Sequence, residues 1–546
     1  MAEDRIIPIC ERLILSVAAL AVMTPAFALA DARSYVRARA AAADGQVGVA
    51  AAGYAAVLAT APDDEVVAVR AYRNALAAGD LALAKRAGTV LTRAEVAPAD
   101  VAILDFADAV RTRNRAAADD ALGRIGAGPL DFLAPVLRAW SAFDRGNDPF
   151  PALDQGADSG LSRRYVTEHR ALLLIATGQI DEAVTALQTV VTADPGSLDL
   201  RWNAAQLFAA KGKRQIAVSL LSGEDPVLVR LRREVSRGPK PSLAFGASRA
   251  LTRLAADLAG QETQALSILL TRSALMLEPG DDRARLLLAA ALTGEGAYDR
   301  ALTVLDAVQP ASPFHAAAMN ERIDVRRKRG DTEGALALAA ELAGARDATT
   351  ADLQRHADLL SAMGRERDAA PVYAKIVERA GDRATWINYL QLGGALERAG
   401  DWAGALPHLR KAVELAPEQP VALNYLGYSQ VERGENLPEA LALLERASAL
   451  RPDDAAITDS LGWAYFKSGD YARALPLLER AARGDPSSVA INEHLGDVYW
   501  RVGRRFEARY AWRAAALYAE GEEKARLTGK MANGLTAATA VRAAAN

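Results

Sequence analysis

The side chains that most often bind metals or act as nucleophiles are few in this sequence of 546 residues, and they lie apart from one another. The only cysteine is Cys10, so the chain can form neither an internal disulfide nor a Cys-x-x-Cys site. The histidines occur singly and form no His-Glu-x-x-His pattern; they are His169, His315, His356, His408 and His494. Because a protein zinc site needs several ligands at short spacing, this pattern predicts no metal site.

Motifs for other kinds of catalysis are also missing from the sequence. There is no Gly-x-Ser-x-Gly nucleophile motif, no phosphate-binding loop and no dinucleotide-binding glycine pattern. Three acidic pairs each follow closely after a proline, and these are Asp63-Asp64, Asp281-Asp282 and Asp453-Asp454. We expect them to cap helices, because carboxylates accept hydrogen bonds from the free amides at a helix start. The chain is predicted to be no enzyme and to need no cofactor; the alternative is a catalytic site among its least regular segments.

The charge balance gives no indication of a nucleic-acid partner. The chain has 65 basic and 68 acidic residues, which makes a formal net charge of −3. We therefore expect an ordinary solvated surface and no nucleic-acid binding. Hydrophobic residues make up 51% of the chain but aromatic residues only 6%, and Ala and Leu fill most of the difference. That composition favours closely packed helices over a β core.

A Leu-Gly pair recurs near the C-terminus at intervals of 34, 35 and 34 residues, which indicates structural repeats. The pairs are Leu392-Gly393, Leu426-Gly427, Leu461-Gly462 and Leu495-Gly496. The glycine allows two helices to cross closely, a Gly-Asp turn such as Gly400-Asp401 separates them, and a proline such as Pro417 ends the second helix. Weaker copies of this pattern extend toward residue 31.

The period and the pattern resemble the tetratricopeptide repeat (TPR). The resemblance implies an all-α fold, a TPR α-solenoid in which antiparallel helix pairs form a right-handed superhelix. Four blocks look like those of large cell-envelope TPR proteins of proteobacteria; they are LNYLGY (423–428), DSLGWAY (459–465), NEHLGDVYWRVGR (492–504) and FEARYAW (506–512). Some similar proteins are outer-membrane lipoproteins that act as adaptors, but the cysteine that carries their lipid is missing here.

The repeats predict an organisation in six parts. These are a signal peptide (1–30), degenerate TPR-like repeats (31–221), a linker or irregular break (222–241), further degenerate repeats (242–384), well-formed TPR repeats (385–520) and a partly disordered tail (521–546).

The predicted signal peptide rests on an apolar run from Leu13 to Ala30. The run ends in Ala28-x-Ala30, which fits the small-residue rule for signal-peptidase cleavage. Its short length and Pro25 favour a cleaved signal over a membrane anchor. We therefore expect the protein in the periplasm or cell envelope, with a peripheral association at most. If this run is not a signal, a cytoplasmic TPR chaperone or regulator is the alternative.

In this family the first helix of each repeat lines the concave face of the superhelix. The Leu-Gly pair marks the buried side, so residues one turn away are expected to face the groove and to be exposed. The predicted partner-binding residues are Asn424, Tyr428, Asp459, Trp463, Lys467, Glu493, Asp497, Trp500 and Arg501. Of the 21 Trp and Tyr residues, 13 lie from Trp386 onward, which suits recognition of an extended peptide or a helix. The alternative is that these rings pack between adjacent repeats.

These observations predict a non-enzymatic scaffold or adaptor that binds a protein or peptide in the concave groove, with no cofactor. A scaffold for polysaccharide export or outer-membrane assembly is an alternative that the sequence does not separate from it.

Overall fold

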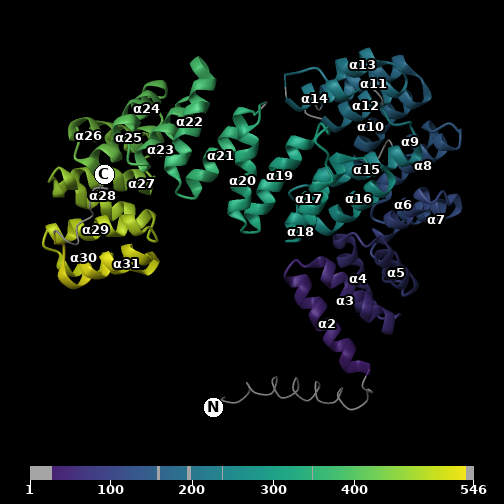
Figure 1. The fold of residues 1–546 in the computed structure, drawn as a ribbon, viewed down its shortest axis with the longest axis horizontal. Helices are drawn as coiled ribbons and strands as arrows, with labels where there is room; N and C mark the ends of the chain where they lie inside the picture. The colour runs from purple at the N-terminus through teal and green to yellow at the C-terminus, as the bar shows by residue number, and fades with distance from the viewer. Residues whose placement is uncertain are drawn as a thin grey trace, which may run out of the picture. The chain divides into compact units, whose positions relative to one another are not determined.

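The computed structural model describes residues 27–156, 160–193, 198–224, 226–235, 238–346 and 348–536, and all regular elements in those ranges are helices. The chain divides into two compact units, Met1–Ala335 and Leu336–Asn546, and Figure 1 labels the helices of each. In the described ranges, no helix combines the length and the apolar character needed to cross a membrane. The predicted signal peptide lies outside the described residues, except that the first helix begins at Phe27.

The first unit contains α2 to α19 and the start of α20. These helices are α2 (Phe27–Ala43), α3 (Val47–Thr60), α4 (Glu65–Ala78), α5 (Leu81–Arg93), α6 (Val101–Arg111), α7 (Arg115–Gly126), α8 (Ala134–Asp144), α9 (Phe150–Asp154), α10 (Gly160–Thr177), α11 (Ile180–Ala193), α12 (Leu198–Ala210), α13 (Arg214–Leu220), α14 (Pro226–Glu234), α15 (Leu243–Asp257), α16 (Gln264–Leu277), α17 (Asp282–Gly294), α18 (Tyr298–Asp306), α19 (His315–Lys328) and α20 (Thr332–Gly344). Most of them pack with their neighbour in the chain as helix pairs.

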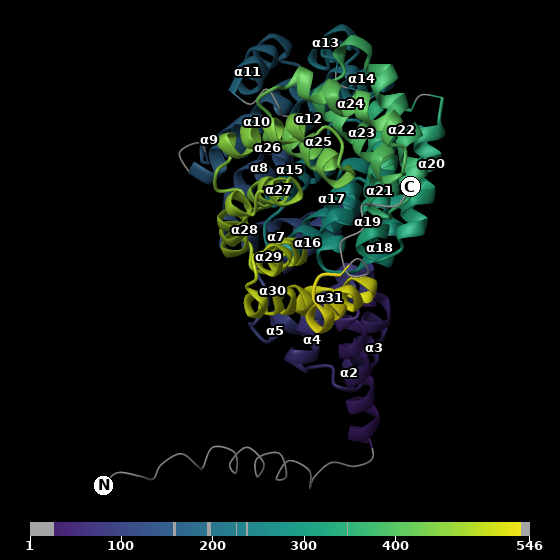
Figure 2. The same cartoon turned by 90° about the vertical axis from the view of Figure 1, so that its left-hand side faces the viewer.

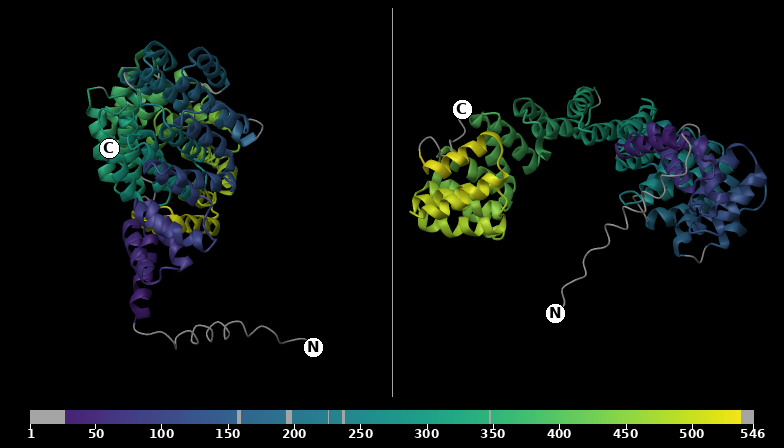
Figure 3. Two further views of the ribbon diagram at one scale, coloured as in Figure 1. Left: turned by 90° about the vertical axis from the view of Figure 1, so that its right-hand side faces the viewer. Right: turned by 90° about the horizontal axis from the view of Figure 1, so that it is seen from below.

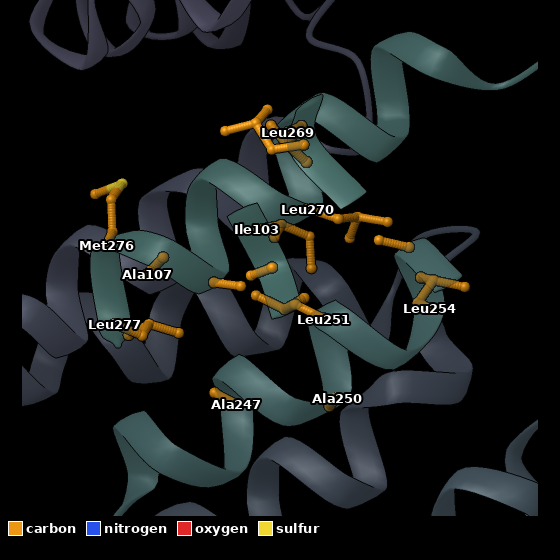
Figure 4. Close-up of a cluster of buried hydrophobic side chains, with 14 of the residues drawn as sticks. Ile103, Ala107, Ala247, Ala250, Leu251, Leu254, Leu269, Leu270, Met276 and Leu277 are labelled. Atoms are coloured by element: carbon orange, nitrogen blue, oxygen red, sulfur yellow. The ribbon is translucent and has the colours of Figure 1, made fainter. Parts of the chain in front are cut away.

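Unit 1 also contains packing between helices far apart in the sequence. Helix α16 packs against α4 and α6, and α15 packs against α8. Figure 4 shows this core, with Ile103 of α6 near Leu251 of α15 and Leu270 of α16. The guanidinium of Arg272 donates hydrogen bonds to the carbonyl oxygens of Leu76 and Ala77 at 3.0 and 3.1 Å. A simple solenoid joins only neighbouring repeats, so these contacts stabilise unit 1 in a way that a repeat pattern does not predict.

The second unit contains the rest of α20 and a regular series of helix pairs. Its helices are α21 (Thr350–Ala362), α22 (Glu366–Ala380), α23 (Trp386–Arg398), α24 (Trp402–Leu415), α25 (Pro420–Arg433), α26 (Leu437–Leu450), α27 (Ala455–Lys467), α28 (Tyr471–Gly484), α29 (Val489–Arg501), α30 (Arg505–Tyr518) and α31 (Gly521–Asn533). Figure 2 shows α25 to α31 stacked in chain order, and the right-hand view of Figure 3 shows the last of them in yellow. The all-α fold of antiparallel helix pairs is therefore as predicted.

Local chemistry explains why each repeat of unit 2 forms two closely packed helices. A Cβ atom added at Gly462 would lie 2.8 Å from Cγ of Leu478, and one at Gly427 would lie 2.8 Å from Cγ of Leu444. Real Cβ atoms do not approach so closely, so glycine is required where the two helices cross. Gly469, in the turn between α27 and α28, has a φ of 85°, which glycine adopts without steric cost.

The three acidic pairs cap helices as expected. The side chains of Asp64, Asp281 and Asp454 accept hydrogen bonds from backbone N–H groups in the first turns of α4, α17 and α27. Each carboxylate thereby satisfies amides that have no partner within the helix.

Two segments expected to be irregular contain helices. Helix α14 lies inside 222–241, and Leu231 and Val235 of that segment are buried in the core of unit 1. Helix α31 lies inside the segment expected as a tail and packs against α30, with Leu527 fully buried. The charged residues of α31 conceal its apolar face in the sequence, because Leu527 and Met531 alone form that face.

Candidate functional site

The predicted partner-binding residues lie in matching positions on the first helices of three successive repeats. Asn424 of α25, Asp459 of α27 and Glu493 of α29 each stand two residues before the leucine of the Leu-Gly pair. Tyr428, Trp463 and Asp497 each stand two residues after it. Residues three or four apart share one face of a helix, so the stacked helices bring these side chains into two adjacent rows.

The prediction that Trp463 is exposed in a groove is wrong, because its ring packs between repeats. Only 2% of Trp463 is exposed. Its ring stacks on Phe466 at 4.7 Å and on His494 of the next repeat at 3.9 Å between ring centroids. The indole N–H donates a hydrogen bond to Glu432 of the preceding repeat. These contacts on both sides make Trp463 part of the core that joins three repeats.

Asp459 is also buried, and it pairs with a histidine that sequence reasoning did not select. Nδ1 of His494 lies 2.9 Å from Oδ2 of Asp459, and both residues are buried. A carboxylate accepts hydrogen bonds, so Nδ1 must carry the proton. Burial disfavours the imidazolium, but Asp459, with Asp497 and Glu432 nearby, outweighs burial and raises the pKa of His494 above its usual value.

Glu493 and Asp497 are buried because α31 covers them. Lys530 of α31 has no exposed surface, and its Nζ lies 2.7 Å from Oε1 of Glu493 and 2.7 Å from Oδ1 of Asp497. Arg526 adds a second cation to Glu493, and Trp512 donates from Nε1 to Oδ1 of Asp497 at 2.9 Å. The prediction that both carboxylates are exposed is therefore wrong.

The pKa directions of these two carboxyl groups differ. Burial raises the pKa of Glu493, but Arg526 and Lys530 outweigh it and hold that pKa below its usual value. Burial dominates at Asp497 and raises its pKa, although the Lys530 ammonium opposes the rise. The pair of cations on Glu493 thus compensates its desolvation better than the single cation shared with Asp497.

The remaining candidates at the last two repeats are more accessible. Arg501 is exposed, and Lys467 is half-buried with its ammonium 5.4 Å from the Trp463 ring centroid. Trp500 is half-buried; it packs on Trp512 at 5.5 Å and lies under the guanidinium of Arg505 at 4.4 Å. Much of the Trp500 ring is therefore already in contact with side chains of α30.

Asn424 of α25 differs from its counterparts because its side-chain carbonyl oxygen is not satisfied within the described repeats. Oδ1 of Asn424 is buried and accepts no hydrogen bond from any described residue. Asp459 at the same position is paired by His494, but the residue that corresponds to His494 one repeat earlier is Ser460, whose hydroxyl donates to Ala456 of its own helix at 2.9 Å. Tyr428 is half-buried, and burial raises the pKa of its hydroxyl above the usual value.

Unit 1 contains a separate polar cluster around a cavity of about 20 Å³, which is room for about one water molecule. His169 accepts a hydrogen bond at Nδ1 from Nε1 of Trp140 at 2.9 Å, and burial lowers its pKa to about 3. Arg249 pairs with Asp281, and Arg283 pairs with Asp199 at 2.8 Å. The charges of this cluster therefore neutralise one another.

Neither cluster has the arrangement of a metal centre. Throughout the described ranges, no group of three or more His, Cys, Asp or Glu side chains is placed so that it could hold a metal ion. The contacts of both clusters are those of buried ion pairs and ring stacks that connect helices.

The comparison with individual proteins finds short or distant matches. A TPR repeat-containing protein of Pseudomonas aeruginosa, PA4667, is 38% identical over 78 residues, which are 14% of this chain and 13% of that protein. The chain therefore matches only a small part of that relative's length.

Among solved structures, the Cut9 subunit assembly of the APC/C, Cut9–Hcn1, matches 93% of this chain and 96% of its own at 16% identity and a TM-score of 0.36. YrrB, described as a TPR protein with an unusual peptide-binding site, matches 36% of this chain and 95% of its own at 21% identity and a TM-score of 0.28. MamA of Desulfovibrio magneticus matches 31% of this chain and 94% of its own at 20% identity and a TM-score of 0.27.

The family comparison covers more of the chain. Two sequence patterns, both described as tetratricopeptide repeat, match this protein. One matches residues 170–220, 355–420 and 459–524, and the other matches 258–320 and 396–462. Together they extend over more than half of the chain, including all the repeats that contain the candidate site. The helix pairs recur at the expected period, in agreement with these matches. The chain therefore belongs to the tetratricopeptide-repeat family.

Proposed function

We propose that this protein is a scaffold that binds a segment of a partner protein on the inner face of α23, α25 and α27. TPR proteins are usually non-enzymatic and bind proteins or peptides, which supports this class of function. The observation that carries the proposal is the buried Oδ1 of Asn424, which accepts no hydrogen bond within the described chain. A buried acceptor without a donor is costly, and a change of the Asn424 side-chain rotamer would turn that oxygen outward, where a backbone amide of a bound peptide would satisfy it.

The surroundings of Asn424 support a peptide rather than a small ligand. Tyr428 lies one turn further along α25 and offers a ring and a hydroxyl, while Lys467 of the next repeat offers a positive charge. Val421, 45% exposed, extends the apolar surface along the same helix. A helix face with one amide, one aromatic ring and an exposed aliphatic group suits an extended segment with an apolar side chain.

The test is selection from a random peptide library displayed on phage, with the folded chain as bait. We expect selected peptides to bind at least tenfold more weakly to Asn424→Ala and Tyr428→Ala, which corresponds to about 1.4 kcal/mol. Arg480→Ala is the matched control, because Arg480 is exposed on α28, the second helix of a repeat. Selected peptides that bind all three variants equally would place the binding surface elsewhere.

We also propose that the protein works in a bacterial cell envelope, as an adaptor that holds an envelope enzyme near its target. The apolar run ending in Ala28-x-Ala30 and the four C-terminal sequence blocks support this location. Amino-terminal sequencing of the protein from its native host should begin at Asp31. A protein that retains Met1 and stays in the cytosol would contradict the location, but it would leave the binding surface untouched.

A further inference from the structure

The outer surface of α30 carries a group of large apolar side chains that no described residue covers. Phe506 is 81% exposed, Tyr510 67%, Leu517 74% and Tyr518 59%; these four residues are called the α30 patch. Phe506 and Tyr510 are one helical turn apart, and Leu517 follows seven residues after Tyr510, so the three form a stripe along the helix. A stripe of exposed aromatic and aliphatic groups usually marks an interaction surface.

The earlier repeats show that this stripe is not simply the open end of the stack. The second helices of those repeats carry small or polar exposed residues at the positions of Phe506, Tyr510 and Leu517. They are Ala472, Pro476 and Arg483 in α28, Pro438, Ala442 and Ala449 in α26, and Ala403, Pro407 and Glu414 in α24. These positions therefore face solvent in every repeat, and a further repeat would not bury them. The large side chains of α30 need another partner.

The charges around the α30 patch are arranged with opposite signs at its two ends. Arg504 and Arg505 are exposed at the start of α30, where Glu507 offsets one of the two charges, and Arg513 lies in the second half of the helix. Glu520, Glu522 and Glu523 are exposed just beyond the C-terminal end of the helix. A helix of 14 residues is about 20 Å long, so the basic and acidic ends are well separated.

We propose that the α30 patch binds the same patch of a second copy of this chain, with the two α30 helices antiparallel. In that arrangement a two-fold axis places the basic start of each helix beside the acidic end of the other, so the surface is complementary to itself. Phe506 of one copy then packs near Leu517 and Tyr518 of the other. The inference concerns the outer face of the last repeat and does not depend on the proposed inner binding surface.

The acidic end of the α30 patch disfavours an anionic membrane as its occupant. Glu520, Glu522 and Glu523 lie directly after Tyr518, so a lipid surface that accepted Leu517 and Tyr518 would be repelled by three carboxylates. A contact formed mainly by one helix from each copy is small, so we expect a weak and reversible dimer.

Light scattering and sedimentation of the full chain across roughly 1 to 100 μM test the proposal. We expect the mass to rise with concentration from that of one 57.8 kDa chain toward two chains. The triple variant Phe506→Ala, Tyr510→Ala, Leu517→Ala should weaken dimerisation at least about tenfold. Leu450→Ala is the control, since Leu450 is exposed at the position of Tyr518 two repeats earlier. All these side chains are exposed, so helix content should stay unchanged.

Charge reversal tests the antiparallel geometry. Arg505→Glu and Glu522→Arg should each weaken dimerisation, because each brings like charges together at both ends of the interface. An equimolar mixture of the two variants should restore pairing, because both ends of a mixed dimer then join opposite charges. A chain that stays monomeric throughout, or a dimer indifferent to these variants, overturns the proposal. Binding to phosphatidylglycerol vesicles that the triple variant loses would overturn it in favour of a membrane.

Discussion

The two units each bury a histidine beside a tryptophan, yet they give the same ring nitrogen opposite hydrogen-bonding roles. In unit 1, Nδ1 of His169 accepts a hydrogen bond from the Trp140 indole, so that nitrogen carries no proton. In unit 2, Nδ1 of His494 faces the Asp459 carboxylate, so that nitrogen must donate. The same ring atom is an acceptor in one unit and a donor in the other.

The difference shows what each unit uses its buried polar groups for. His169 satisfies one indole N–H inside a core whose charges pair among themselves, and burial therefore dominates its pKa. At His494 burial also lowers the pKa, but the carboxylates of Asp459, Asp497 and Glu432 together outweigh it and raise that pKa. His494 of α29 pairs with Asp459 of α27, and Lys530 of α31 pairs with Glu493 of α29, so each partner comes from the next layer of the stack. In unit 2 buried charge pairs add to the packing between successive repeats, whereas unit 1 also packs helices that are far apart in the chain.

Removing Lys530 should have the largest effect, since it leaves Glu493 and Asp497 buried with too little positive charge. We expect Lys530→Met to destabilise unit 2 by roughly 3–5 kcal/mol, the usual result of breaking a buried ion pair. Lys524→Met, on the exposed face of the same helix, should change stability by less than about 0.5 kcal/mol. Urea unfolding followed by segment-resolved hydrogen exchange would measure both. Equal stabilities would mean that charge pairing does not join these repeats.

Replacing the tryptophans compares the two cores directly. We expect Trp463→Ala to cost roughly 3–5 kcal/mol, as usual for a large buried ring, and to loosen α27 and α29 in hydrogen exchange. Trp140→Ala should cost a similar amount but affect α8, α10 and α15 instead. Thermal melting with hydrogen exchange distinguishes the two. If Trp463→Ala leaves the melting temperature unchanged but abolishes partner binding, Trp463 contacts the partner and is not part of the core.

A bulky residue at the helix crossing should have a smaller effect. Gly462→Leu places side-chain atoms against Leu478, and we expect it to destabilise unit 2 by about 1–3 kcal/mol. Gly469→Ala, in the turn of the same repeat, tests backbone strain instead and should cost about 1 kcal/mol. The denaturation midpoint of unit 2 measures both changes. No loss for Gly462→Leu would show that the two helices are less closely packed than described.

The most gradual effect is a dependence of stability on pH that has opposite signs in the two units. The raised pKa of His494 gives stability that is complete below about pH 6.5 and is lost as pH rises through its folded pKa. The lowered pKa of His169 gives stability that is present above about pH 6.5 and is lost as pH falls toward about 3. Each slope is at most about 1.4 kcal/mol per pH unit.

Variants separate the two contributions. We expect His494→Gln to flatten the fall of unit 2 stability between pH 6 and 8, and His169→Gln to flatten the fall of unit 1 stability between pH 6 and 4. Hydrogen exchange of α29 and of α10, corrected for intrinsic exchange rates, reports each unit separately. The same sign of pH dependence in both units would contradict the assigned roles of Nδ1.

The sequence predicts the helix pairs of unit 2 well because their causes are local. Gly462 is needed where two helices cross, Asp454 caps the next helix, and Pro486 follows the end of α28, each within its own repeat. The same reasoning fails for the candidate site. The repeat pattern identifies the helix face that Trp463, Glu493 and Asp497 occupy, but their exposure depends on the helix that packs against that face. For Glu493 and Asp497 this helix is α31, which has too few apolar residues to be recognised in the sequence.

The sequence by itself determined that this protein is a TPR array, since a 34-residue period of Leu, Gly, Ala and Pro specifies pairs of crossing helices. Only the tertiary structure decided which polar side chains on those helices are paired within the fold. Burial of a side chain depends on the residues that face it from neighbouring helices. His494 and Lys530 therefore pair with the carboxylates of the last repeats, whereas Oδ1 of Asn424 faces no donor and stays unsatisfied. For the same reason, the packing of α16 on α4 and α6 in unit 1 follows from contacts between residues far apart in the chain, which no repeat period records.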